Sequence, residues 1–313
     1  MKIHTIFAAL NAAIRAAAQH ISGRHFSRKS PLTAEAVIRL FISAEGGCLA
    51  KILHTAGLDV TASALSQRRA QIPSDVFRAV FDRFNSACVD DGLFRDYRLL
   101  AVDGTAVNLP RNPAAPSFVQ NDGIPKGVNQ LHVTPLYDIL NRTFSDVIIQ
   151  PEPKKDEIGA LVEMLERNTF PQKTLIIADR GFESYNLIAH CLEKQNVDFL
   201  IRIKQSHSAM QEVAKLPMME LDCNISFTIT TTQTNKDKKN GYIHLQVPKQ
   251  GLRHGGAAGT FQRHTKCVST FAAFCWTTAS FKRLPLLCSR PLRLQIFGNS
   301  TTCAGGWKLP SAV

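Results

Sequence analysis

The stretch LLAVDG at residues 99–104 returns later in the chain as LIIADRG at residues 175–181, and this repetition decides the predicted fold. Each copy has four apolar residues, then an aspartate, then a glycine within two positions. A short continuous apolar run is typical of a strand that is buried on both faces of a sheet. Such a strand does not tolerate an unpaired carboxylate in its interior, so we expect Asp103 and Asp179 at strand ends that face a cleft.

The two aspartates are therefore the candidate catalytic and metal-binding residues. Ligands of open sheets bind at the carboxyl ends of parallel strands. If the two strands are neighbours, Asp103 and Asp179 repel each other unless a cation lies between them. Mg²⁺ (or Mn²⁺) suits ligands that are all oxygen, and two such ions about 4 Å apart can activate a water or a 3′-hydroxyl for attack on a phosphodiester. The alternative is that each aspartate only begins a turn before a glycine, but the repetition favours metal ligands.

The segments around these strands predict an α/β protein, a mixed sheet with flanking helices. Apolar periodicity gives the order strand, strand, strand, helix, strand, helix, strand, which matches the ribonuclease-H-like fold. The expected elements are strands at 99–102, 131–139, 143–150, 175–178 and 197–203, and helices that begin at Asp156 and near Tyr185. Residues 108–130 are rich in Pro, Asn and Gly, and we predict that they form a long functional loop.

A small β insertion is expected at about residues 219–250, because apolar residues alternate at 225–229 and strand-like residues return at 242–247. The lysine-rich segment 236–239 is predicted to be a basic loop before the Asn240-Gly241 turn. The chain is thus divided into a helical domain at 1–95, a ribonuclease-H-like domain at 96–250 and a tail at 251–313.

Short helices are predicted throughout residues 1–95, with Thr33, Thr61 and Ser74 as successive caps. Adjacent arginines, Arg68 and Arg69, end the helix that Thr61 caps, and they suit a DNA-reading helix of the helix-turn-helix kind. An ordinary helical bundle with a solvated arginine pair is an equal alternative.

The first segment, residues 1–24, is apolar but is interrupted by Asn11 and Arg15 and has no small-residue cleavage pattern. We interpret it as an amphipathic helix and not as a signal peptide. No apolar run reaches the ~18 residues that a membrane span needs. The eight cysteines include no CxxC pair, which argues against a zinc site and a disulfide framework and favours reduced thiols in a cytosol.

The charge of the chain is high and unevenly distributed. The formal net charge is +12 in 313 residues, which indicates a polyanionic partner such as nucleic acid. Residues 251–313 contain eight Lys or Arg and no Asp or Glu, so all 25 acids lie in the first 250 residues. The same tail holds four of the eight cysteines and both tryptophans, which indicates a change in the character of the sequence near residue 250.

Two sequence blocks carry a family resemblance. Asp103-Gly104-Thr105, after its apolar strand, resembles the first-aspartate motif of IS4-type insertion-sequence transposases, which belong to the DDE class. Asp179-Arg180-Gly181-Phe182, with the strand DFLIRIK at 198–204 that follows a helix, resembles their second-aspartate block. The second block is the more specific one, because residue types match over some twenty-five positions. The resemblance covers roughly residues 30–250.

The resemblance implies Mg²⁺-dependent cleavage and transfer of DNA strands at the terminal inverted repeats of a mobile element. It also implies a synaptic complex with target DNA, formed by a homodimer in the bacterial cytoplasm at the nucleoid. The long loop and the β insertion would then approach DNA. The candidate DNA-binding residues are Arg68, Arg69, Arg180, Arg202 and Lys204. Arg202 and Lys204 share one strand face, which suits a phosphate contact or, equally, a solvated edge.

The sequence departs from the family pattern at the third carboxylate. A glutamate should follow the β insertion in the motif Tyr, two residues, Arg, three residues, Glu, but no acid occurs after Asp237. We hypothesise that the tail is translated out of frame. Trp307-Lys308 must be encoded UGG-AAR, and a shift by two bases forces a glutamate codon there. The shifted codons of residues 300–313 permit the family spacing of Tyr, Arg and Glu.

Without that glutamate this copy is expected to lack transposition activity. Two other functions stay open: a DNA-binding remnant that occupies element ends without cutting, and a two-metal nuclease with the same aspartates.

Overall fold

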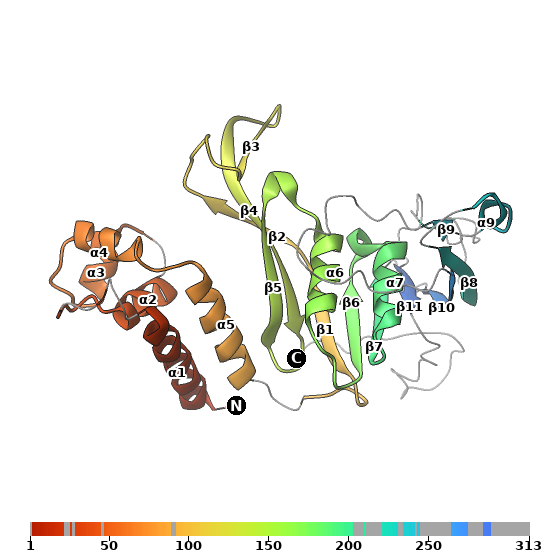
Figure 1. The fold of residues 1–313 in the computed structure, drawn as a ribbon, viewed down its shortest axis with the longest axis horizontal. Coiled ribbons are helices and arrows are strands. Elements are labelled where there is room, and N and C mark those ends of the chain that lie inside the picture. The colour runs from red at the N-terminus through yellow and green to blue at the C-terminus, as the bar shows by residue number, and fades with distance from the viewer. Residues whose placement is uncertain are drawn as a thin grey trace, which may run out of the picture. The chain divides into compact units, whose positions relative to one another are not determined.

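The computed structural model describes residues 2–21, 26, 29–44, 47–88, 92–202, 210, 221–230, 234–241, 243–244, 264–274 and 284–288 (Figure 1). From residue 221 onward most of this description concerns the backbone. The chain divides into two compact units, residues 1–91 and 92–313. No helix in the described ranges is long and apolar enough to cross a membrane.

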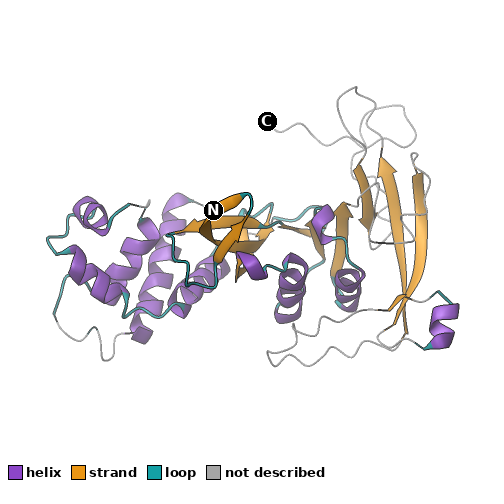
Figure 2. Cartoon of the chain, turned by 90° about the horizontal axis from the view of Figure 1, so that it is seen from above, coloured by secondary structure: helices purple, strands orange, loops and turns teal. Residues whose placement is uncertain are grey.

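The first unit is helical, as its periodicity predicts (Figure 2). Its helices are α1 (Ile3–Ile21), α2 (Ala34–Ser43), α3 (Leu49–Thr55), α4 (Ala62–Arg69) and α5 (Asp75–Ala87). Helix α1 is amphipathic, and its small buried face packs with α2 and α5 around Ile14, Ile38 and Val80. A second cluster, around Val37, Leu53 and Leu65, joins α2, α3 and α4.

The threonine caps of this unit are confirmed, and the serine cap is wrong. Thr33 Oγ1 accepts a hydrogen bond from Ala36 N at 3.2 Å, and Thr61 Oγ1 accepts one from Ala64 N at 3.1 Å. Each satisfies one of the backbone donors that the first turn of a helix leaves unpaired. Ser74 precedes α5 but already has helical backbone angles, φ −65° and ψ −30°, and its side chain caps nothing.

The second unit is built on three parallel strands: β1 (Arg98–Val102), β6 (Thr174–Ala178) and β7 (Val197–Arg202). The strand β4 (Ile124–Asp138) runs antiparallel to β1, and β5 (Thr143–Pro151) continues from it as a hairpin. Arg142 in the turn adopts φ 54°. This arrangement of strands is the ribonuclease-H-like mixed sheet that the element order predicts.

Two helices, α6 (Glu157–Arg167) and α7 (Tyr185–Glu193), cover one face of this sheet (Figures 1 and 2). Beneath them lie Leu100 and Val102 of β1 with Ile176 and Ala178 of β6, all buried. On the other face Leu175 is also buried, but Leu99, Ala101 and Ile177 are only half-buried. The expectation that both apolar runs are buried on both faces is therefore too strong: one face is buried and the other partly so.

The prediction of a long loop at 108–130 is wrong. Most of this segment is a β arm made by β2 (Thr105–Leu109), β3 (Phe118–Asn121) and the first half of β4. Strand β2 continues the pairing of β1 along β4 in the same antiparallel register, with only Asp103 and Gly104 between the two strands. Polar cross-strand contacts hold the arm together, so apolar periodicity did not reveal it.

Gly127 and Asn129 explain how so polar an arm keeps its shape. Gly127 has φ +67°, and a Cβ there would overlap the ring of Phe118, so only glycine fits. The buried Asn129 amide donates to the backbone carbonyl of Asn112 at 2.9 Å and to Ser117 Oγ at 3.0 Å. The glycine and asparagine that look like loop signals are here structural residues of paired strands.

The C-terminal strands extend the same sheet beyond β7. They are β8 (Leu221–Thr230), β9 (Ile243–His244), β10 (His264–Phe274) and β11 (Leu284–Cys288), and the order across the sheet is β2-β4-β1-β6-β7-β11-β10-β8-β9. Strands β10 and β11 lie in the tail after residue 250, and β10 pairs with β8 along ten register positions. Backbone pairing needs no apolar period.

The basic segment 236–239 belongs to a short helix, α9 (Asn235–Lys239), and not to a loop. Thr234 and Asp237 form a reciprocal capping box that pairs the first backbone donors of the helix. The turn at Asn240-Gly241 follows as predicted, with φ +70° at Gly241.

Candidate active site

Asp103 and Asp179 lie at corresponding positions on neighbouring parallel strands. In the β1–β6 register Leu100 faces Ile176 and Val102 faces Ala178, so the next residue on each strand is an aspartate. Neighbouring strands lie about 4.8 Å apart, so the two carboxylates leave the same edge of the sheet side by side. This is the carboxyl edge, where the strand ends of such sheets bind ligands.

Each aspartate is oriented by a backbone N–H of the glycine that follows it. Asp103 Oδ1 accepts a hydrogen bond from Gly104 N at 2.8 Å, and Asp179 Oδ1 accepts one from Gly181 N at 2.7 Å. Asp179 also begins the 3₁₀ turn η2 (Arg180–Phe182). Both side chains are exposed at this edge. The aspartates thus begin turns, as the alternative interpretation states. In each aspartate, however, the second carboxylate oxygen takes no part in the turn's hydrogen bond.

Arg202 stands beside the second aspartate. Its Nη2 lies 3.6 Å from Asp179 Oδ2, and the two side chains are 37% and 49% exposed, so solvent leaves this ion pair weak. Strand β7 pairs with β6 on one side and with β11 on the other, so Arg202 does not lie on an edge strand, and its side chain is partly exposed. Its guanidinium stays near the carboxyl edge because the strand ends there.

A third carboxylate, that of Glu157, lies at the same edge. Glu157 is the first residue of α6, and Asp156 caps that helix by accepting a hydrogen bond from Gly159 N at 2.8 Å. A Cβ added at Gly104 would overlap Glu157 Oε1, and one added at Gly181 would lie 3.7 Å from Glu157 Oε2. Glu157 therefore reaches the backbone beside both aspartates.

Buried His132 stands behind Glu157 on β4. Its Nε2 lies 2.7 Å from Glu157 Oε1, and its Nδ1 lies 2.9 Å from Glu152 Oε2. Lys155 Nζ in turn lies 2.7 Å from Glu152 Oε1, and this hydrogen bond is the main reason why the pKa of Glu152 lies below its ordinary value, with His132 adding to the effect. The imidazole is thus enclosed between two carboxylates.

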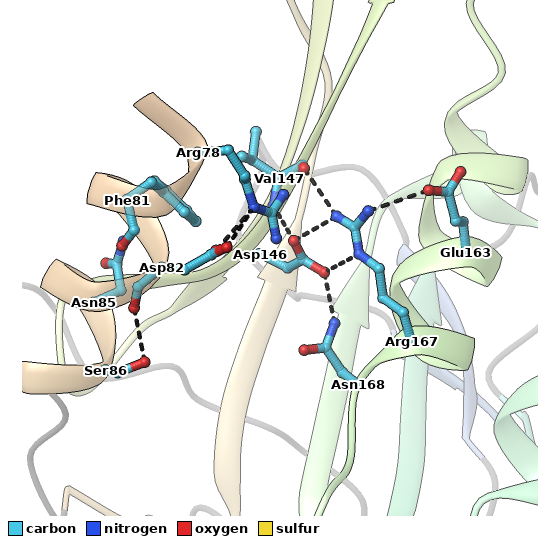
Figure 3. A network of polar contacts seen from close by, with 10 residues as sticks. All are labelled: Arg78, Phe81, Asp82, Asn85, Ser86, Asp146, Val147, Glu163, Arg167 and Asn168. Atoms are coloured by element: carbon cyan, nitrogen blue, oxygen red, sulfur yellow. Dashed lines mark hydrogen bonds and ion pairs between the residues drawn. The ribbon is translucent and has the colours of Figure 1, made fainter. Parts of the chain in front are cut away.

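Two other acids of this unit, Asp138 and Asp146, are tied into the fold. The buried Asp146 carboxylate accepts hydrogen bonds from Arg167 Nε at 2.7 Å, from Arg167 Nη2 at 2.5 Å and from Asn168 Nδ2 at 2.6 Å (Figure 3). Asp138 is fully buried and accepts from Arg98 Nε at 2.6 Å and from Asn141 Nδ2 at 2.9 Å. The Asp146–Arg167 pair joins β5 to α6, and the Asp138–Arg98 pair joins β4 to β1.

A cluster of Glu166, His190 and Glu193 has ligand atoms within 4.8 Å of one another. It lies where α6 and α7 end. Glu166 is already paired there, with His190 at 3.0 Å and with Lys194 at 3.4 Å. We therefore interpret this cluster as a surface contact between the two helices.

The predicted DNA-binding arginines fall in different places. Arg68 and Arg69 end α4 in the helical unit, where Arg68 stacks on Phe26 at 5.1 Å and Arg69 stacks on Phe41 at 5.3 Å. Arg68 is partly buried and Arg69 is exposed. Arg180 is exposed in the turn after Asp179, in the second unit. Lys204 lies outside the described residues.

Comparison with known families adds one finding. The family described as "Transposase DDE domain" matches residues 94–280. The match includes Asp103, Asp179 and Glu157, and it extends thirty residues into the acid-free tail. No curated protein matches the chain.

Proposed function

The chain belongs to the family of transposase DDE domains, and from this premise we propose that it derives from an IS4-type insertion-sequence transposase. Asp103 and Asp179 are, in this proposal, the first two catalytic carboxylates. The observation that carries it is the β1–β6 register, in which the two aspartates occupy corresponding positions at the carboxyl edge. Residues that serve only as turns have no reason to coincide in this way.

Members of this family generally use divalent metal ions. The donors here fit such an ion, because the two carboxylates are adjacent, exposed and each oriented by a backbone N–H. Hard oxygen ligands favour Mg²⁺ or Mn²⁺. Asp103 and Asp179 would hold the ion, which would supply an activated water or 3′-hydroxyl and stabilise the leaving oxygen of a phosphodiester.

Transposases bind DNA, and a net charge of +12 supports contact with its phosphates. We propose that the partner is double-stranded DNA that carries the terminal inverted repeats, joined later by target DNA in a synaptic complex of two copies. Arg180 directly follows Asp179 in the chain, and the Arg202 guanidinium lies beside the Asp179 carboxylate. Together with Lys204, two residues after Arg202, they are proposed as phosphate contacts near the scissile bond. Arg68 and Arg69 would contact the repeat, and the bacterial nucleoid is where such DNA resides.

The present copy is proposed to bind DNA without transferring strands. No acid follows Asp237, so the family's third glutamate is missing from this sequence. The family match reaches residue 280, which argues against a change of reading frame near residue 250. We place the proposed change of reading frame between residues 280 and 300. The shifted codons of residues 300–313 then permit the family spacing of Tyr, Arg and Glu.

A strand-transfer assay tests this proposal. The chain as printed should retard inverted-repeat DNA in a gel but yield no transferred strand in Mg²⁺. A version whose frame is restored after residue 280 should transfer strands, and Asp103→Asn in that version should abolish transfer while DNA binding persists. Strand transfer by the present chain would overturn the inactivity. Full transfer by the restored Asp103→Asn version would overturn the assignment of the aspartate.

A further inference from the structure

Helix α4 is held in a fixed orientation on its two neighbours, α2 and α3 (Figure 1). Its Leu65 is fully buried and packs with Val37 of α2 and Leu53 of α3. The turn from α3 to α4 is also fixed, because Leu58 N donates to Leu53 O at 3.0 Å and Gly57 takes the left-handed conformation at φ +66°. The fold therefore sets which side of α4 faces away from this core.

The outward side of α4 is polar but uncharged. Ser63, Ser66 and Gln67 recur at the spacing that places residues on one side of a helix, and all three are exposed. In the part of the chain that the structure describes, none of these side chains hydrogen-bonds to another residue. Serine inside a helix is unfavourable relative to alanine, because its hydroxyl competes for backbone hydrogen bonds. The fold therefore gains nothing from these hydroxyl and amide groups.

Two arginines flank this uncharged side, and aromatic rings orient them. Each residue advances about 100° around a helix, so Arg68 and Arg69 fall on the two flanks of the side that carries Gln67. Arg69 is exposed and stacks on Phe41 at 5.3 Å, and the partly buried Arg68 stacks on Phe26 at 5.1 Å. The guanidinium groups therefore border the outward side and do not cover it.

The segment around α4 is basic as well. Residues 1–74 contain nine Lys or Arg but only three Asp or Glu, and α4 itself contains no acid. One of the three acids, Glu35, already pairs with Arg39 at 2.8 Å. An excess of cations attracts the phosphates of DNA whatever its sequence. Affinity for phosphates and an uncharged helix side thus occur in one unit.

We propose that α4 enters the major groove of the repeat DNA, where Ser63, Ser66 and Gln67 read base edges and Arg68 and Arg69 bind the phosphates beside them. This inference rests on the proposed function, because it takes DNA binding by the chain as given. The major groove is about 12 Å wide, admits a helix, and presents uncharged donors and acceptors between two rows of phosphates. A glutamine amide pairs with both N6 and N7 of adenine, so Gln67 should prefer an A·T pair.

The test selects duplexes with the full chain from a library whose core is randomised, and sequences the bound fraction. The variants are Gln67→Ala, the pair Ser63→Ala with Ser66→Ala, Arg69→Gln, and Gln19→Ala as a matched control on the exposed side of α1. Alanine is the better helix former, so the alanine variants should keep α4 folded. Gln67→Ala should reduce the preference at one base-pair position by at least about fivefold. The control should select the wild-type sequence.

The arginine provides a second readout that separates affinity from specificity. Arg69→Gln should weaken the binding of every duplex alike and lower the slope of log K against log salt by about one. A wild type that binds the library without any sequence preference overturns the inference and leaves DNA binding standing. An unchanged preference in Gln67→Ala and in the serine pair overturns it in the same way. A wild type that binds no DNA removes the proposed function as well.

Discussion

The second unit contains two kinds of aspartate, whose carboxylates have different hydrogen-bond partners. Asp138 and Asp146 are buried, and each receives an arginine and an asparagine side chain. Asp103 and Asp179 are exposed, and each receives the backbone N–H of a nearby glycine. The first pair consumes its hydrogen-bonding capacity inside the fold. The second pair stays at the exposed edge, where only the weak ion pair with Arg202 adds to the partners of Asp179.

This difference teaches how to recognise a functional carboxylate in this chain. A buried charge without a partner is costly, so the arginines beside Asp138 and Asp146 are obligatory for stability. Two neighbouring carboxylates also repel each other when no positive charge fully neutralises them. The fold keeps Asp103 and Asp179 at a solvent-exposed edge, where this repulsion is small. Substitutions at the buried pair should therefore lower the stability of the fold, whereas substitutions at Asp103 and Asp179 should lower cation binding.

The largest effect is expected from Arg98→Met. It leaves the fully buried Asp138 without its arginine, and loss of one partner of a buried pair costs about 3 kcal/mol or more in unfolding free energy. Urea unfolding measures this loss. Adding Asp138→Asn should recover part of it, because the uncompensated charge is then gone. If the double variant is as unstable as Arg98→Met alone, the buried charge is not the cause.

A smaller effect is expected from Asp156→Ala, which removes the cap of α6. Loss of a side-chain cap costs about 1 kcal/mol, because the backbone N–H of Gly159 loses its partner. Thr61→Ala is the matched control, because it removes the cap of α4 in the other unit. Both variants should lose a similar amount of unfolding free energy in urea. An unchanged unfolding free energy in Asp156→Ala would show that this cap does not stabilise α6.

The smallest effect is expected from the pH dependence of Glu152. The hydrogen bond from Lys155, helped by His132, holds the pKa of Glu152 below its ordinary value. Its stabilising contribution is therefore complete above the ordinary pKa and is lost as the pH falls through the lowered one. Because Lys155 is half exposed, we expect less than about 1 kcal/mol. Glu152→Gln should flatten the fall of unfolding free energy in mild acid, and parallel curves would contradict this cause.

The sequence predicted the parts of the fold that depend on local patterns. The apolar runs before Asp103 and Asp179 predicted β1 and β6. The order of strands and helices along the chain predicted the mixed sheet. Threonine caps were predicted correctly at Thr33 and Thr61, where one side chain and the next turn decide the outcome. These features are local, so a single sequence contains the information for them.

The parts that depend on cross-strand contacts were not predictable in the same way. The β arm is held by Gly127 against Phe118 and by Asn129 beside Asn112, and these residue types otherwise indicate a loop. Glu157 looked like an ordinary helix-opening acid, because its position beside Gly104 arises only when β1, β4 and α6 come together. The glycine after Asp103 was the available signal, but it also suits a plain turn.

The most direct test of the aspartate pair is a double-mutant cycle of unfolding free energy with Asp103→Asn and Asp179→Asn, run in EDTA and in Mg²⁺. If the two carboxylates face each other as neighbours, each single variant should match or exceed the wild type in EDTA, and their effects should not add. In Mg²⁺ the wild type alone should gain stability, by about 1.4 kcal/mol when the free ion is at ten times its Kd. Additive effects that are the same in EDTA and Mg²⁺ would contradict a shared cation site.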